Sequence, residues 1–315
     1  MIKNKYKKIQ EPQCFTLLSK SGNFAGTHNV AHMKNVLLPL FLLFSLSVTA
    51  QYYYNDIIGT EETNRLMKTY SDNKVRTVSA SGTDQRGVKA TDFSEYHEVR
   101  ENGRALKSTS IINLNKTVLY SRFDEKGRVI SMTDSSTNIE SITTYEYDGA
   151  GRLSRVTNSV KDSANDFTQV EEHLWIYNAK NKPEKMWRII RSSLSSGLDS
   201  LEVKFVADED GNPAEERTYR GKVETGYLYY YYDDKNRLSD IVRYNNKARK
   251  LIPDVLFEYD EDNRVVQKIT TTSSINLGYL IWRYIYNDKG LKSKEALFNR
   301  EKELTGRIDY TYTFL

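Results

Sequence analysis

The sequence predicts an all-β protein: an antiparallel meander of tandem hairpins that forms a twisted open sheet or a partial β-shell, with a small N-terminal cap. Three observations predict this class. The chain of 315 residues contains 23 Tyr but only 5 Pro, and tyrosine favours strands because its ring fits a half-buried pleated surface. One motif recurs seven times in a single register. Apolar and polar residues alternate on both sides of each copy, with the period of a strand.

The first element along the chain is an apolar segment near the N-terminus. Residues 36–48 read VLLPLFLLFSLSV, with MKN before them and TAQ after them. A short basic start, an apolar stretch of this length and small residues at the end are typical of a secretory signal peptide, whereas a membrane span needs about 20 residues. We therefore expect a signal peptide at 33–50 with cleavage after Ala50. Residues 1–32 are then an upstream extension, with Met33 or Met1 as the true start.

Removal of this leader changes the charge and the cysteine content. The whole chain has 46 Lys and Arg against 42 Asp and Glu, but residues 1–50 hold six Lys and one Glu. The remaining chain has 40 basic and 41 acidic residues, so the basic surface expected of a nucleic-acid-binding protein is missing. The single cysteine, Cys14, also lies in the leader, which excludes disulfides and cysteine metal sites from the rest. We expect an exported bacterial protein in the periplasm, on the cell surface or outside the cell.

Residues 51–95 differ from the rest of the chain. A short helix is predicted around 61–70, with Thr60 as its N-cap, and residues 74–82 alternate like a strand. We interpret this region as an N-terminal cap that covers the first edge of the sheet, because an exposed edge invites aggregation. The repeat domain is expected at 96–315.

The repeated motif dominates this second region. Its aromatic anchor position is followed directly by Asp or Asn and, three residues after that, by Gly or Asn. Successive anchors lie 24 to 30 residues apart. The seven copies are 122–132, 146–156, 176–186, 206–216, 231–241, 258–268 and 285–295, with anchors Phe123, Tyr147, Tyr177, Ala207, Tyr232, Tyr259 and Tyr286. A weaker copy starts at Val99.

This spacing predicts a hairpin turn in each copy. Asp or Asn side chains accept hydrogen bonds from backbone N–H groups at the start of a turn, and Gly or Asn tolerates the left-handed conformation that closes a type I turn with a bulge. The turn pairs are Asp124 and Gly127, Asp148 and Gly151, Asn178 and Asn181, Asp208 and Gly211, Asp233 and Asn236, Asp260 and Asn263, and Asn287 and Gly290. Each copy is therefore predicted to be two strands, and the array about fourteen or more.

The core Tyr147-Asp148-Gly149-Ala150-Gly151-Arg152 resembles the YD repeat of the RHS family, and the resemblance covers roughly residues 96–315. In that family, long arrays spiral into hollow β-shells that enclose toxin domains, or display surfaces for adhesion and carbohydrate contact. This chain has too few repeats to close such a shell, so the resemblance does not imply toxin encapsulation here.

No chemistry for catalysis is apparent in the sequence. Past residue 50 the two histidines are His97 and His173, and the nucleophile, metalloprotease and phosphate-loop motifs are absent. The many carboxylates fall mostly at turns, and Asp208–Asn212 has the wrong glycine phase for a calcium loop. We predict no enzyme activity, no cofactor and no metal.

Aromatic rows are the remaining candidates for function. Two residues before the anchor, six of seven copies carry an aromatic residue, on the same sheet face as the anchor. A structural role in burying that face is favoured for most of these rings. The excess of tyrosines at 227–232 places rings on both faces, so Tyr229 and Tyr231 are predicted to bind a ligand, with Trp187 and Trp282 as further candidates.

The favoured function is a non-catalytic surface or periplasmic binding module for a glycan or an envelope protein. The alternatives are a structural or assembly component of the envelope and an outer-membrane β-barrel. Charges such as Glu146, Glu258 and Arg283 interrupt the lipid-facing band that a barrel would need, so we expect neither an integral membrane protein nor a nucleic-acid partner.

Overall fold

The computed structural model describes residues 52–113, 115–135, 139–245, 249–271 and 278–315. All of them belong to the compact unit Leu37–Leu315. The predicted upstream extension, the signal peptide and Cys14 lie outside the described residues. Within the described part of the chain, no helix has the length and apolar character needed to cross a membrane.

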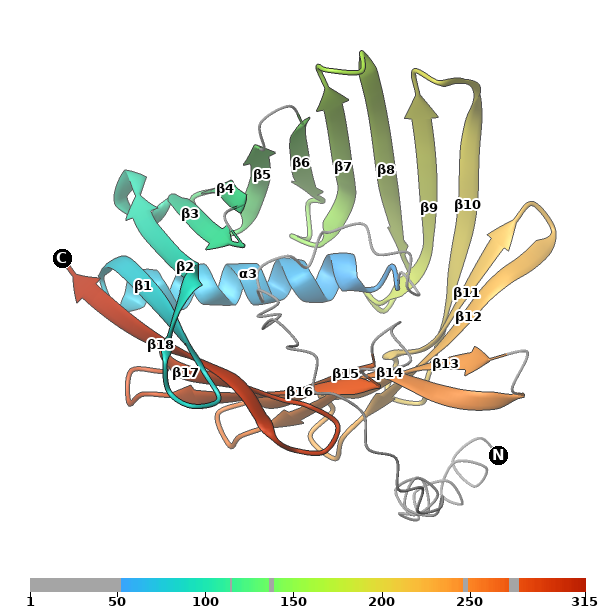
Figure 1. Ribbon diagram of the computed structural model, residues 1–315. Helices are drawn as coiled ribbons and strands as arrows, with labels where there is room; N and C mark the ends of the chain where they lie inside the picture. Colours follow the sequence, from blue (N-terminus) through green and yellow to red (C-terminus); the bar gives the residue numbers. More distant parts are fainter. Residues whose placement is uncertain (1–51, 114, 136–138, 246–248, 272–277) are drawn as a thin grey trace, which may run out of the picture. The chain divides into compact units, whose positions relative to one another are not determined.

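The described residues form an 18-stranded antiparallel sheet in which each strand pairs with the next one along the chain (Figure 1). The meander predicted from the repeats is confirmed. The strands are β1 Val75–Asp84, β2 Lys89–Arg100, β3 Ala105–Ile112, β4 Asn115–Phe123, β5 Val129–Ser135, β6 Ile139–Tyr147, β7 Leu153–Asp162, β8 Phe167–Tyr177, β9 Pro183–Ser192, β10 Ser195–Ala207, β11 Pro213–Arg220, β12 Val223–Tyr232, β13 Leu238–Asn245, β14 Lys250–Tyr259, β15 Val265–Thr271, β16 Tyr279–Tyr286, β17 Lys292–Phe298 and β18 Leu304–Phe314.

The sheet is closed, which corrects the predicted open sheet or partial shell. The last strand, β18, pairs antiparallel with β1, so that Val78 lies opposite Tyr312 and Ala80 opposite Tyr310. Closure into a barrel pairs the N–H and C=O groups that β1 and β18 would otherwise expose at two edges. The sequence contains no local signal for this pairing, because the two strands lie more than 200 residues apart.

Each repeat turn joins two strands through the same short set of hydrogen bonds. In the turn after β6, the Asp148 N–H donates to the Arg152 carbonyl at 2.9 Å, and the Gly151 N–H donates to the Asp148 carbonyl at 2.9 Å. The Asp148 carboxylate accepts from the N–H groups of Ala150 and Arg152 at 3.0 and 2.9 Å. Gly151 has φ +82°, a conformation that costs a residue with a Cβ about 1 kcal/mol or more. Positive φ recurs at Gly127, Asn181, Gly211, Asn236, Asn263 and Gly290.

Neighbouring repeats are joined by an arginine and a tyrosine. The Arg128 side chain donates to the Asp124 carboxylate at 2.8 and 2.6 Å, and its guanidinium lies 4.3 Å from the centroid of the Tyr147 ring in the next repeat. The Tyr147 hydroxyl donates back to the Val129 carbonyl at 2.9 Å. The hydroxyl bond recurs from Tyr177 to Leu153, Tyr232 to Pro213, Tyr259 to Leu238 and Tyr286 to Val265, at 2.7 to 2.9 Å. The anchor tyrosine therefore fixes the register between successive hairpins.

The helix α3 (Asn55–Asp72) lies inside the ring of strands (Figure 1), which corrects the predicted cap over a sheet edge. It begins six residues earlier than the predicted helix, and Thr60 is buried within it instead of capping it. Met67 and Tyr70 of α3 pack in one cluster with Val78 and Leu106 of the sheet. Because β1 pairs with both β18 and β2, there is no edge at β1 for a cap to cover. Strand β2 also crosses the predicted domain boundary at residue 95.

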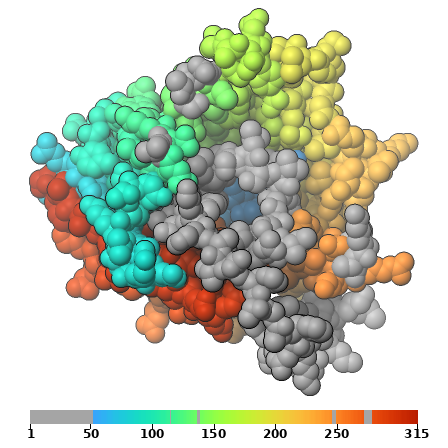
Figure 2. Space-filling model, in the orientation of Figure 1, coloured from blue at the N-terminus to red at the C-terminus, as the bar shows by residue number. Residues whose placement is uncertain are grey.

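The buried core lies at the end of the sheet that carries the repeat turns. In β10 the first residues are exposed, whereas Leu201, Val203 and Phe205, near the turn, are buried. Most of the aromatic residues two positions before the anchors, such as Tyr145 and Trp175, are buried there too. In the space-filling view, part of α3 is visible within the ring of coloured strands (Figure 2). Most of the buried region is thus a belt around α3, and a smaller cluster of Ala80, Phe93 and Ile308 lies further along β1, β2 and β18.

Candidate functional site

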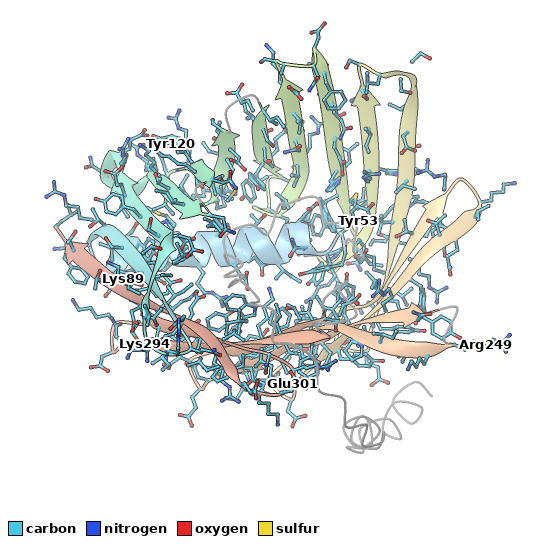
Figure 3. The ribbon with its side chains drawn as sticks, viewed as in Figure 1. Tyr53, Lys89, Tyr120, Arg249, Lys294 and Glu301 are labelled. Atoms are coloured by element: carbon cyan, nitrogen blue, oxygen red, sulfur yellow. The ribbon has the colours of Figure 1, made fainter. Side chains whose placement is uncertain are left out.

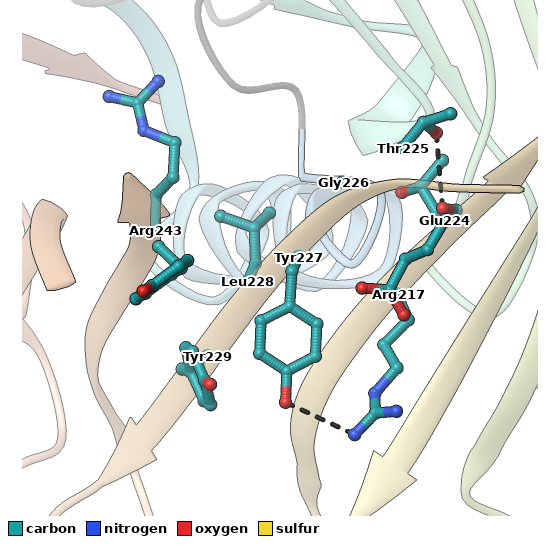
Figure 4. Close-up of a pocket in the computed structure, with 10 residues that line it drawn as sticks. Arg217, Glu224, Thr225, Gly226, Tyr227, Leu228, Tyr229 and Arg243 are labelled. Carbon is teal, nitrogen blue, oxygen red and sulfur yellow. Dashed lines mark hydrogen bonds between the residues drawn. The ribbon is translucent and has the colours of Figure 1, made fainter. Parts of the chain in front are cut away.

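A groove opens in the wall of the sheet between β12 and β13. The pairing of these two strands ends at Leu228 and Arg243, whereas β11 and β12 stay paired as far as Arg220 and Val223. The β11–β12 hairpin therefore extends past the end of the β12–β13 ladder. The resulting groove has a volume of about 650 Å³ (Figure 4).

Two tyrosines and an arginine form the outer wall of this groove. Leu228, Tyr230 and Tyr232 of β12 point toward the core, so strand alternation places Tyr227 and Tyr229 on the opposite face. The two rings meet edge to face, with centroids 4.5 Å apart and planes at 88°. This arrangement is a favoured geometry for an aromatic pair and fixes both rings relative to each other.

Arg217 of β11 holds the first of these rings in place. Its guanidinium donates to the Glu215 carboxylate at 3.0 and 2.6 Å and to the Tyr227 hydroxyl at 3.3 Å, and it lies 5.0 Å from the Tyr227 ring centroid. Burial raises the pKa of Tyr227, and the nearby Tyr229 and Glu215 raise it further. The phenol is therefore neutral at physiological pH and keeps its hydroxyl proton as a hydrogen-bond donor.

The opposite wall of the groove contains Arg243 and Tyr244 of β13. Arg243 forms an ion pair with Asp254 of β14 at 3.0 Å. Within the described residues, the Nε atom of Arg243 and the Oδ2 atom of Asp254 are buried without a hydrogen-bond partner. A buried polar atom without a partner costs about 1–3 kcal/mol, and because both atoms are buried, a ligand in the groove does not reach them.

The structure brings only one of the four predicted binding residues into the groove. Tyr229 lines it. Tyr231 lies half-buried two residues further along the same face of β12, outside the groove. Trp187 of β9 is 36% exposed, with the Lys185 amine 5.9 Å from its ring.

Trp282 is the predicted binding residue that the structure contradicts. It is 6% exposed and packs with Tyr284 and Leu297 in the core. Trp282 lies two residues before Tyr284, which faces the core. Because side chains alternate with a period of two along a strand, the sequence already indicated that Trp282 is buried. Arg217, Tyr227 and Arg243 were not predicted, although Tyr227 shares the face of Tyr229 by the same alternation.

A polar network inside the sheet connects α3 to the wall. The Nδ1 atom of His173 lies 2.6 Å from the Asp56 carboxylate of α3, and its Nε2 atom lies 2.9 Å from Glu171. Arg188 donates to the same Glu171 at 2.8 and 3.0 Å. The indole N–H of Trp175 donates to Asp56 at 3.1 Å. Since carboxylates hold both ring nitrogens, the histidine anchors the helix.

The charges of this network shift the pKa values of its members. Burial alone would lower the pKa of His173, but the Asp56 charge and the hydrogen bonds to Asp56 and Glu171 raise it to about 9. Burial would raise the pKa of Glu171, but the hydrogen bonds from His173 and Arg188 lower it to about 2. The network therefore contains an ionised carboxylate and a protonated imidazole at neutral pH.

A second anchor holds the start of α3. The carboxylate of Glu216 on β11 accepts from the backbone N–H groups of Tyr53 and Tyr54 at 3.0 and 3.1 Å, and from the Tyr230 hydroxyl at 2.6 Å. Tyr53 lies inside the ring of strands, beside the start of the helix (Figure 3). Complete burial raises the pKa of Glu216 to about 7, against the lowering effect of these donors.

The other histidine takes no part in this network. His97 of β2 is buried, and its Nδ1 atom lies 2.7 Å from the Ser108 hydroxyl. In the parts of the chain that the structure describes, no three His, Cys, Asp or Glu side chains come together in a way that could hold a metal ion.

Comparison with known families and structures identifies the repeat. The family model described as RHS Repeat matches residues 123–161, a segment that includes the turns at Asp124 and Asp148. The resemblance to RHS repeats is thereby confirmed. The comparison with curated proteins finds no match.

Among solved structures, the chain is similar to the Tc holotoxin pore of Photorhabdus luminescens at 13% identity and a TM-score of 0.30, over 70% of this chain and 12% of that one. It is also similar to a porin-like protein from Bacteroides uniformis, at 9% identity and a TM-score of 0.37, over 76% of this chain and 97% of that one. A porin-like protein from Bacteroides vulgatus matches at 11% identity and a TM-score of 0.28, over 76% and 99%. TM-scores this low support no conclusion about function.

Proposed function

We propose that this RHS-repeat chain is a non-catalytic, exported binding module that holds a carbohydrate in the groove between β12 and β13. The observation that carries the proposal is the fixed edge-to-face pair of Tyr227 and Tyr229, with Arg217 bonded to the Tyr227 hydroxyl, on the outer face of the sheet. The groove volume of about 650 Å³ falls within the range of about 300–1,000 Å³ that is usual for ligand sites.

The chemistry of the lining suits a sugar. Tyrosine combines a flat apolar face, on which the C–H face of a pyranose can stack, with a hydroxyl that remains hydrogen-bonded. Arg217, held by Glu215, adds guanidinium N–H donors beside the rings. Stacking rings beside paired polar groups are the combination that a hydroxyl-rich ligand requires.

Export supports the same proposal. Residues 33–50 have the three-part pattern of a signal peptide, and a binding module for glycans needs to be outside the inner membrane to meet them. An RHS repeat within a closed β-sheet is also consistent with a component of the cell envelope.

The proposal is tested by titrating the full chain with glycans selected on an array and measuring affinity by calorimetry. Tyr229→Ala is expected to weaken binding by at least tenfold, because stacking on an aromatic side chain contributes about 1–3 kcal/mol in the comparable case of nucleobases. Tyr227→Ala should weaken it similarly.

Tyr231→Ala is the matched control, because it removes the same side chain from the same face of β12 outside the groove. Affinity in this variant should stay within twofold of the wild-type value. An equal loss of affinity in Tyr229→Ala and Tyr231→Ala would contradict the assignment of the binding site to the groove. If the chain bound an envelope protein and no glycan, the ligand would be a protein and the carbohydrate proposal would be wrong.

A second candidate function is a structural component of the envelope. The bonds from each anchor tyrosine to the preceding repeat, together with α3 inside the sheet, favour a rigid scaffold. A chain with this role would bind no glycan, and deletion of its gene would change envelope integrity.

A further inference from the structure

A second cleft lies at the end of the sheet that carries the repeat turns. One side is the face of α3 around Arg65 and Lys68, and the other consists of the turn after β2, with Arg104, and the turn after β4, with Lys126 and Arg128. The β2–β3 connection includes the 3-10 turn η1 (Glu101–Gly103). The cleft has a volume of about 690 Å³ and contains no part of the β12–β13 groove.

The cleft has a marked excess of positive charge. Five basic side chains line it against two acidic ones, Asp124 and Glu125, which leaves three positive charges in excess. Asp124 is engaged with Arg128 at 2.6 Å. Glu125 is 91% exposed and lies 3.8 Å from Arg104, a separation at which an exposed pair contributes little.

Two of the five basic groups form no ion pair. Lys68 is paired with Asp72 at 2.6 Å. Arg65 and Lys126 have no carboxylate within 4.0 Å among the residues that the structure describes. Both side chains are exposed, so a ligand can reach them without breaking a contact.

The walls of the cleft are held at a fixed separation. A Cβ atom at Gly103 (φ +84°) would lie 2.9 Å from the Ser71 hydroxyl, so the turn and the helix are in close contact there. The Asn64 side chain accepts from the Val129 N–H at 2.8 Å, which joins α3 to the start of β5. The basic groups therefore sit on two surfaces that are already positioned, and this reduces the cost of ordering them around a ligand.

We propose that this cleft binds a sulfate or phosphate ester carried on an oligosaccharide. Guanidinium and ammonium groups from two surfaces would converge on the ester oxygens, with which arginine forms paired hydrogen bonds. The cleft is much larger than one anion, since the share of a water molecule in the liquid is about 30 Å³, so the anion is attached to a larger body.

The rest of the lining identifies that body as a saccharide. Asn64, Ser71 and Asn102 provide amide and hydroxyl groups that match sugar hydroxyls. Nothing aromatic lines the cleft as described, so a nucleobase has no ring to stack on. Met67 is its one apolar side chain of any size among the described residues and is buried, which leaves no surface for an acyl chain.

The test uses the full chain and a heparin-derived hexasaccharide, with the fully desulfated and N-acetylated hexasaccharide, which keeps its carboxylates, as the probe without sulfate. The double variant R65A/K126A is expected to lose at least tenfold in affinity for the sulfated probe, and its affinity should depend less on salt. The desulfated probe should bind the wild-type chain at least tenfold more weakly. Thermal melting of each variant checks that the fold is retained.

The matched control is K180A/K235A. These lysines occupy the same position as Lys126 in two other repeat turns. The backbone N–H of Lys180 donates to the Asn178 side chain at 2.9 Å, and that of Lys235 donates to the Asp233 carboxylate at 3.0 Å. Neither lysine lines the cleft. Affinity within twofold of wild type in this control supports the proposal, and equal loss in both double variants would show attraction to the general surface instead.

Two further arms separate this site from other ligands. Vesicles containing anionic phospholipid are expected not to bind. The saccharide assignment would be overturned if the chain bound these vesicles but not the hexasaccharide, and if R65A/K126A abolished the vesicle binding. The Tyr229→Ala variant should bind the sulfated probe as the wild type does, so failure of the cleft and failure of the β12–β13 groove give different results.

Discussion

The start of α3 depends on one buried side chain, Glu216. Three donors converge on its carboxylate, two from the backbone of Tyr53 and Tyr54 and one from the Tyr230 hydroxyl. A carboxylate accepts all three bonds, whereas an amide presents an NH₂ group to at least one of these donors.

We expect Glu216→Gln to lower the free energy of unfolding by about 2–3 kcal/mol, because a buried donor is left without an acceptor. Chemical denaturation measures this change. Glu184→Gln, on the exposed face of β9, should stay within about 0.5 kcal/mol of the wild type. A loss of the same size in both variants would show that Glu216 has no special role.

His173 and Glu171 predict how stability depends on pH. The pKa of His173 is raised to about 9 in the folded chain, so its contribution is complete below its ordinary value near 6.5 and is lost as the pH rises through 9. The pKa of Glu171 is lowered to about 2, so its contribution is complete above about 4.5 and is lost as the pH falls through 2. The raised pKa of Glu216 also makes the folded state less stable as the pH rises toward 7.

The melting temperature should therefore be highest near pH 4.5 and should decline on the alkaline side, through Glu216 toward pH 7 and through His173 up to about pH 9. In His173→Asn the part of this decline above pH 6.5 should be reduced, in addition to a lower overall stability. A melting temperature that rises from pH 6.5 to 9, or an unchanged slope in the variant, would contradict the assignment.

At the scale of the secondary-structure elements, the turns were predictable, whereas the start of the helix and its position were not. Each turn is specified by contacts within five residues, such as those of Asp148 with Arg152, so the local sequence contains all the information. The first turn of α3 is fixed by His173, which lies 117 residues from its partner Asp56. Its helical character from residue 55 on, and its position inside the sheet, had no local signal.

The same distinction applies to the candidate site. The alternation of side chains around Tyr230 correctly placed Tyr229 on the outer face of the sheet. The same alternation around Tyr284 places Trp282 on the inner face. The groove itself arises because the β12–β13 pairing ends earlier along β12 than the β11–β12 pairing does. Strand length and hairpin divergence are properties of paired strands, and a single sequence does not display them.

Adjacent aspartates in the turn after β12 test the local rule. The Asp233 carboxylate accepts from the N–H groups of Lys235 and Arg237 at 3.0 and 2.9 Å, and from the Arg237 side chain at 2.7 Å. We expect Asp233→Ala to cost about 2 kcal/mol.

Asp234→Ala, one residue further along, should be nearly neutral, since no comparable contact holds that side chain among the described residues. Denaturation of the two variants in parallel measures the difference. Similar values for both would mean that the turn does not depend on the capping carboxylate.

At the scale of the whole molecule, the β1–β18 ladder has a consequence for how the protein is made. Its partners are separated by more than 220 residues at every pair, so the circumference remains incomplete until β18 has left the ribosome. Until then the growing chain presents two strands with unsatisfied backbone groups, one directly joined to α3. A nascent chain in that condition is prone to associate with its neighbours, and a chaperone that shields β1 during synthesis would prevent it.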